Sequence, residues 1–160
     1  ISDVCSSDLF SLALLRAAKE KGLDTAMETC LYTADGKIRD FIPVTDLFLA
    51  DLKLIDGELH RRYTGVDNGP ILRNFRTLAD AGANILVRVP LIPGHTATAE
   101  NLRAVRDYVR SVRSDIPIEA LNFNPFARDK YRVAGIPYVF QDITAPFSES
   151  EMAEFRSLLE

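Results

Sequence analysis

The chain has 160 residues, of which 47% are hydrophobic and 26% are charged, values ordinary for one soluble globular domain with a real core. Its net charge of -4 and its pI near 5.2 argue against bulk nucleic-acid binding, which favours a basic surface. No apolar stretch approaches the roughly 20 residues of a membrane span, no signal peptide is visible, and two cysteines make neither a disulfide framework nor a four-ligand metal site, so a reducing, cytoplasmic setting is expected.

The first nine residues form a segment that we exclude from fold reasoning. Residues 2–9, SDVCSSDL, match the translation of a sequencing adapter, and the chain does not start with Met. We therefore expect residues 1–9 to be an assembly artefact and residues 10–160 to be the C-terminal part of a longer protein. A natural disordered start is the alternative.

From there on, helices and strands alternate. Apolar residues at helical spacing predict a helix over residues 10–21, with Gly22 as its stop. Asp56, Pro70 and Ser148 mark further helix starts, and Gly82 marks a helix end. The pattern predicts strands over residues 24–29, 46–53, 83–92 and 116–123, helices over 38–44, 56–63, 70–81, 98–112 and 148–159, and mostly loop over 124–147.

This alternation predicts an α/β fold with a parallel sheet and right-handed crossovers. The strands are continuous apolar runs, which are typical of parallel sheets. Four strands are too few for a closed eight-stranded barrel, so the sheet is either open or part of a barrel. No internal repeat and no second domain stand out.

Charged side chains gather where the predicted strands end. Asp51 and Lys53 project to the same face of one strand end, because side chains at i and i+2 do so. The carboxyl ends of parallel strands meet at one edge, where such folds bind ligands. The candidate residues at this edge are Glu28, Thr29, Asp51, Lys53, Arg88, Asn122 and Asn124. This mixed set suits a zwitterionic, hydroxyl-bearing ligand.

Simpler interpretations stay open for these residues. Glu28 could form a salt bridge with Lys53 or Arg88, and Asp51 could pair with Lys53. Cys30 is more typical of a buried small hydrophobic residue than of a reactive thiol. His60 and His95 have no second metal ligand nearby in the sequence, and we expect both to be solvent-exposed.

Taken together, the segments from about Phe10 to Tyr138 resemble the C-terminal half of a glycyl-radical-enzyme activating enzyme of the pyruvate formate-lyase activating type, within the radical SAM superfamily. Each segment alone is weak, but their order and spacing are specific. The carriers are TAMET at 25–29, DLFLADLK at 46–53, His60 with Thr64, Gly65 and Asn68, Ile71 and Leu72 with Asn74, VRVPLIPG at 87–94, and Lys130, Tyr131 and Tyr138.

The resemblance implies a partial (β/α)6 barrel, truncated here to about four parallel strands. It implies a [4Fe-4S] cluster on a Cys-x3-Cys-x2-Cys loop and S-adenosylmethionine, cleaved to a radical that takes a hydrogen atom from a glycine of a partner glycyl radical enzyme, such as a formate-lyase or a dehydratase. An electron donor such as flavodoxin or ferredoxin is implied too. The residues matching its S-adenosylmethionine contacts are Glu28, Thr29, Asp51, Lys53 and Arg88, and the first three also match a monovalent-cation site.

The chain departs from the family pattern at three places. It lacks the Cys-x3-Cys-x2-Cys loop, so the cluster ligands are absent, and it lacks the Gly-Gly-Glu-Pro segment. Many members have a His for adenosine contacts near the last strand, where this chain offers Asn124 or Phe126. We therefore expect the fragment alone to be inactive. The alternatives are a cluster-free α/β barrel enzyme or a non-catalytic domain that binds a small carboxylate or phosphate ligand at the strand ends.

Overall fold

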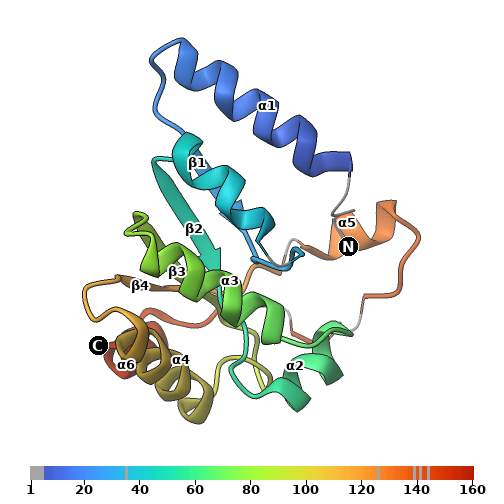
Figure 1. Cartoon of the computed structure of the whole chain (residues 1–160). Coiled ribbons are helices and arrows are strands. Elements are labelled where there is room, and N and C mark those ends of the chain that lie inside the picture. The colour runs from blue at the N-terminus through green and yellow to red at the C-terminus, as the bar shows by residue number, and fades with distance from the viewer. Residues whose placement is uncertain (1–5, 35, 126, 139, 141, 144) are drawn as a thin grey trace.

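Four parallel strands form the sheet on which the rest of the chain packs (Figure 1). The computed structural model describes residues 6–34, 36–125, 127–138, 140, 142–143 and 145–160. The strands are β1 (Ala26–Thr29), β2 (Leu47–Asp51), β3 (Ile85–Pro90) and β4 (Ile118–Leu121), in the spatial order β1-β2-β3-β4. Each strand lies inside its predicted range, so the predicted parallel α/β architecture is confirmed.

The helices connect and cover the strands. They are α1 (Ser6–Glu20), the 3-10 helix η1 (Lys37–Val44), α2 (Gly57–Thr64), α3 (Gly69–Asp80), α4 (Ala99–Val112), α5 (Ala127–Val133) and α6 (Glu149–Leu159). Figure 1 shows α1 beside the β1 end of the sheet, whereas α4 and α6 pack together near β4. None of the helices in the described ranges has the length and apolar composition to cross a bilayer.

The predicted helix ends are largely confirmed. The Asp56 side chain accepts a hydrogen bond from the Leu59 N–H at 2.8 Å and caps α2, and Ser148 and Glu151 form the predicted capping box of α6. Gly82 follows α3 with φ +70°, a backbone conformation that favours glycine.

Two helices differ from the prediction. Helix α1 begins at Ser6 rather than at Phe10, and Asp8 supplies the acidic first turn that favours a helix N-terminus. That residues 1–9 derive from an adapter stays a prediction. Helix α5 lies in the predicted loop, because its short, mostly charged sequence has no apolar period to reveal it.

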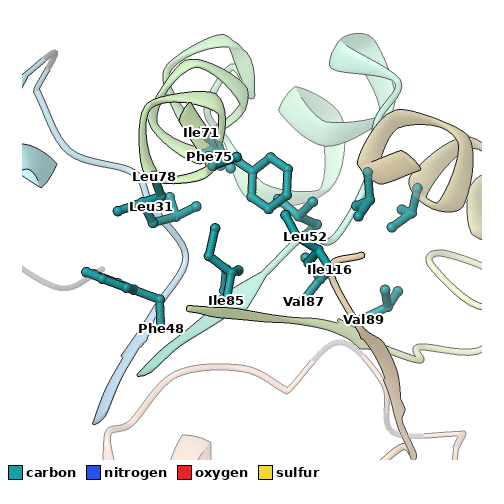
Figure 2. Packing of buried hydrophobic residues seen from close by; sticks show 14 of the residues in the cluster. Leu31, Phe48, Leu52, Ile71, Phe75, Leu78, Ile85, Val87, Val89 and Ile116 are labelled. Carbon is teal, nitrogen blue, oxygen red and sulfur yellow. The ribbon is translucent and has the colours of Figure 1, made fainter. Parts of the chain in front are cut away.

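The core lies between the sheet and the helices on one of its faces. Figure 2 shows Phe48, Ile85, Val87 and Val89 on the side of the sheet where α3 presents Ile71, Phe75 and Leu78. The same cluster contains Leu31, Leu52 and Ile116, each at most 2% exposed. Burial of this apolar surface is the main stabilising term of the fold.

The opposite face of the sheet carries the polar side chains. Asp51 and Arg88 alternate with the buried residues of β2 and β3, Glu28 lies between the half-buried Met27 and Thr29 of β1, and none of the three charged residues is buried. Asp51 pairs with Arg88 in the register of β2 and β3. Glu28 of β1 pairs with Leu49, two residues before Asp51 on β2. The parallel pairing therefore brings these three charges to one end of one face.

Candidate ligand site at the carboxyl ends of the strands

Arg88 joins the three strand ends through two ion pairs. Its Nη2 lies 2.9 Å from Asp51 Oδ1 and 2.5 Å from Glu28 Oε1, and its Nε donates to Asp51 Oδ1 at 3.1 Å. The Arg88 side chain is 12% exposed and that of Asp51 is 21% exposed, whereas that of Glu28 is 66% exposed. The cluster is thus anchored by a nearly buried cation and opens to solvent at Glu28.

The charges of this cluster reinforce one another. The hydrogen bond from Arg88 holds the pKa of the Glu28 carboxyl below its usual value of 4.5. The carboxylates of Glu28 and Asp51 in turn raise the pKa of Arg88. Because the folded-state pKa of Glu28 is lowered, its contribution to stability is present above pH 4.5 and is lost as the pH falls through that lowered pKa.

A cleft of about 390 Å³ opens beside this cluster, within the size range of small-molecule sites. Its wall combines carboxylates and hydroxyls with apolar and aromatic side chains. The lining residues are Asp8, Ser11, Met27, Glu28, Thr29, Cys30, Tyr32, Thr33, Ile38, Phe41 and Asp51. Three of the predicted site residues, Glu28, Thr29 and Asp51, therefore share one cleft.

The loop after β1 is held in an unusual conformation. Leu31 is fully buried and has φ +59°, which is uncommon for a residue other than glycine. The Thr29 hydroxyl accepts a hydrogen bond from the Leu31 N–H at 3.0 Å. The buried Asn74 amide donates to the Leu31 and Thr33 carbonyls at 2.9 and 3.0 Å. These contacts fix the end of β1, where Glu28 and Thr29 lie.

Lys53 and Asn124 both lie beyond the ends of their strands. Lys53 is half-buried two residues beyond the end of β2, and no ion pair joins it to Asp51 among the described residues, since Asp51 pairs with Arg88 instead. Asn124 is exposed, three residues beyond the end of β4. The Asn122 side-chain amide forms two hydrogen bonds with the backbone of Phe147, so it has a structural role. Phe126 lies outside the described residues.

The expectation that both histidines are exposed is wrong. His60 is 3% exposed, because its Nδ1 hydrogen bonds to the Val66 carbonyl at 2.8 Å and satisfies the buried ring. His95 is half-buried between the rings of Tyr63 and Phe140, at centroid distances of 4.5 and 5.2 Å. Cys30 is half-buried in the wall of the cleft rather than fully buried.

The donor set at the strand ends suits a ligand that carries both charges. A carboxylate finds a guanidinium donor in Arg88, and an ammonium group finds acceptors in Glu28 and Asp51. The described residues contain no group of three or more His, Cys, Asp or Glu side chains arranged to hold a metal ion.

The sequence analysis assigned no structural role to the buried amides that hold the strand-end loops, although Asn68 and Asn74 belong to the segments that carry the family resemblance. Asn68, Asn74 and Asn101 are each at most 7% exposed and bind loop carbonyls with their side chains. The available signal was Asn74 on the apolar side of a predicted helix, since asparagine disfavours helix interiors unless its amide is used elsewhere.

Curated proteins similar to this chain share one activity in their names. A pyruvate formate-lyase-activating enzyme of Streptococcus mutans is 34% identical over 143 residues, covering 86% of this chain and 54% of that protein. A (2S)-3-sulfopropanediol dehydratase activating enzyme of Klebsiella oxytoca is 30% identical over 139 residues, covering 84% and 43%. A trans-4-hydroxy-L-proline dehydratase activating enzyme of Clostridioides difficile is 32% identical over 162 residues, covering 99% and 53%. The chain thus spans about half the length of the curated relatives it matches.

A solved structure supports the fold. A domain of a pyruvate-formate lyase-activating enzyme from Bacteroides vulgatus superposes with a TM-score of 0.75 at 23% identity, covering 99% of this chain and 89% of that domain. This likeness shows that the two chains share the fold, a parallel α/β sheet with flanking helices. No family model matches the chain.

Proposed function

Because this chain belongs to the family of glycyl-radical-enzyme activating enzymes, we propose that it forms the part of such an activase that binds the amino-acid portion of S-adenosylmethionine. The observation that carries this proposal is the Glu28–Arg88–Asp51 cluster beside the cleft at the strand ends. The amino-acid portion of S-adenosylmethionine carries one ammonium and one carboxylate, which match the two signs of charge there.

Each residue has a proposed task in holding the ligand. Glu28 and Asp51 accept hydrogen bonds from the ammonium group, whereas Arg88 and Lys53 bind the carboxylate. The oxygens of Glu28, Thr29 and Asp51 also suit a monovalent cation, since hard cations prefer oxygen ligands. Asn124 is proposed for the adenosine portion.

The iron–sulfur cluster does not fit the residues of this chain. A Cys-x3-Cys-x2-Cys loop needs three cysteines, and the chain has Cys5 and Cys30 only. We propose that residues outside this sequence hold the cluster, as expected for a C-terminal part of the activase. Bound together, the cluster and S-adenosylmethionine supply the radical chemistry, and this chain orients the ligand.

The partners follow from the same assignment. The relatives are named as activators of several glycyl radical enzymes, a formate-lyase and dehydratases among them. We propose a glycyl radical enzyme as the partner, an electron donor such as flavodoxin or ferredoxin, and a cytoplasmic location. The alternative, a cluster-free enzyme or binding domain for a small carboxylate or phosphate, uses the same strand ends.

Isothermal titration calorimetry on the 160-residue chain tests the ligand assignment. We expect S-adenosylmethionine to bind at least about tenfold more tightly than methylthioadenosine, which lacks the amino-acid portion, because hydrogen bonds to charged groups each contribute about 1.5–3 kcal/mol. Equal affinities, or binding of neither compound, would contradict the proposal. Preferential binding of phosphate or of simple carboxylates would favour the alternative.

Anaerobic reconstitution with iron and sulfide tests the proposal that this chain does not hold the iron–sulfur cluster. We expect the chain alone to show no visible sulfur-to-iron charge-transfer absorbance, because two cysteines are too few for the cluster loop. We also expect it to release no 5′-deoxyadenosine from S-adenosylmethionine. A reconstituted cluster with 5′-deoxyadenosine as a product would overturn the assignment.

A further inference from the structure

The segment Lys53–Ile55 follows the end of β2, pairs with no strand of the part of the chain that the structure describes, and bends at Ile55. Leu52 and Leu54 are 2% and 3% exposed, whereas Asp51, Lys53 and Ile55 are half-buried, so the alternation of the strand persists. The hydrogen bond from the Leu52 N–H to the Arg88 carbonyl, at 3.0 Å, extends the β2–β3 pairing by one residue past β2. Backbone groups buried beyond that point need other partners.

Two buried asparagine side chains supply these partners. The Asn101 amide donates to the Lys53 carbonyl at 2.9 Å and to the Thr96 carbonyl at 3.0 Å, and its Oδ1 accepts from the Ile55 N–H at 3.4 Å. The Asn68 amide donates to the Leu54 and Ile55 carbonyls at 3.1 and 2.8 Å. The two side chains thus replace the missing strand along Lys53–Ile55.

Both asparagines lie at helix starts, but their side chains hydrogen bond to the backbone of the loop after β2. Asn68 occupies the N-cap position of α3, yet its side chain makes no capping hydrogen bond. Asn101 lies in the first turn of α4, which Thr98 already caps. The two residues are 6% and 7% exposed, and a buried amide is costly unless it is hydrogen-bonded. Their geometry therefore matches the loop rather than the helix ends.

These hydrogen bonds determine where the Lys53 side chain leaves the backbone. Hydrogen bonds from Asn101 and Asn68 hold the backbone of residues 53–55, and the alternating burial of residues 51–54 places the Lys53 side chain on the face of Asp51. No hydrogen bond or ion pair of the Lys53 ammonium group is formed with the residues that the structure describes. The backbone therefore sets the face of the chain from which the Lys53 side chain projects.

We propose that Asn101, assisted by Asn68, is a positioning residue that aims Lys53 at the ligand carboxylate. This inference rests on the proposed binding of S-adenosylmethionine. Asn74 provides a matched comparison, because it is also buried and binds two carbonyls of a strand-end loop, but that loop follows β1 and does not contain Lys53.

A double-mutant cycle read by calorimetry with S-adenosylmethionine tests the inference. The variants are Asn101→Ala, Lys53→Met and the double variant, with Asn74→Ala and Lys53→Met as the control cycle. We expect Asn101→Ala to weaken binding by about tenfold when Lys53 is present and by less than about twofold when it is Met. Its loss of thermal stability should be the same in both backgrounds, and the Asn74 cycle should be additive. If Asn101→Ala does not fold, Asn68→Ala takes its place in the same cycle.

The outcomes separate the two proposals. An equal loss of affinity with and without Lys53, while the unaltered chain binds S-adenosylmethionine, overturns the positioning role and leaves the proposed function standing. Absence of binding by the unaltered chain overturns both. Dependence of the Asn101 effect on Lys53, with an additive Asn74 cycle, supports the positioning role.

Discussion

Replacing Arg88 with methionine is expected to weaken binding of S-adenosylmethionine by at least about 30-fold. The change removes the guanidinium proposed to bind the ligand carboxylate, and it leaves Glu28 and Asp51 as two carboxylates without their shared counter-ion. Removing one member of a largely desolvated charge pair typically costs about 2–5 kcal/mol, which corresponds to this loss. Calorimetry at neutral pH measures it.

A matched surface arginine controls for charge alone. Arg61 forms an ion pair with Asp67 at 2.7 Å but is 63% exposed, so Arg61→Met should change affinity by less than about twofold. Arg88→Lys keeps the charge but loses the guanidinium that contacts both Glu28 and Asp51, so we expect a loss of affinity between those of Arg61→Met and Arg88→Met. If Arg88→Met lowers stability yet leaves the affinity unchanged, the cluster is structural and the proposed ligand contact is wrong.

Replacing Phe75 with alanine is expected to have the largest effect on stability, a loss of about 3–5 kcal/mol in the free energy of unfolding. Phe75 of α3 is fully buried in the core (Figure 2), and its ring centroid lies 5.8 Å from that of Tyr108. The substitution leaves a cavity in a close-packed core. Urea denaturation followed by circular dichroism measures the change.

An exposed apolar residue gives the comparison for Phe75. Val133 in α5 is 84% exposed, so Val133→Ala should change the free energy of unfolding by less than about 0.5 kcal/mol. A loss below about 1 kcal/mol for Phe75→Ala would show that the core is not packed as described.

The sequence was sufficient for the features that depend on local periodicity. The apolar runs and their charged ends predicted four parallel strands, and the period of two placed Asp51 and Lys53 on one face. Asp56 and Ser148 revealed their helix starts because capping uses residues adjacent in the chain.

Features that depend on contacts between distant elements were not predictable in the same way. Arg88 pairs with Glu28 and Asp51 because of the register of three strands, which left Lys53 without the salt bridge considered for it. His60 is buried because the chain turns back after α2 and brings the Val66 carbonyl to its ring. The roles of Asn68 and Asn101 likewise required the loops to be in place.

The central claim is that Arg88 and its two carboxylates bind the amino-acid portion of S-adenosylmethionine. The most direct test follows the Arg88 Nε–H signal by nuclear magnetic resonance while the 15N-labelled chain is titrated with S-adenosylmethionine or methylthioadenosine, with Arg88→Lys to assign the signal. We predict a saturable shift with S-adenosylmethionine and none with methylthioadenosine. An Arg88 signal that does not move at saturating S-adenosylmethionine, or that moves equally with both compounds, would contradict the claim.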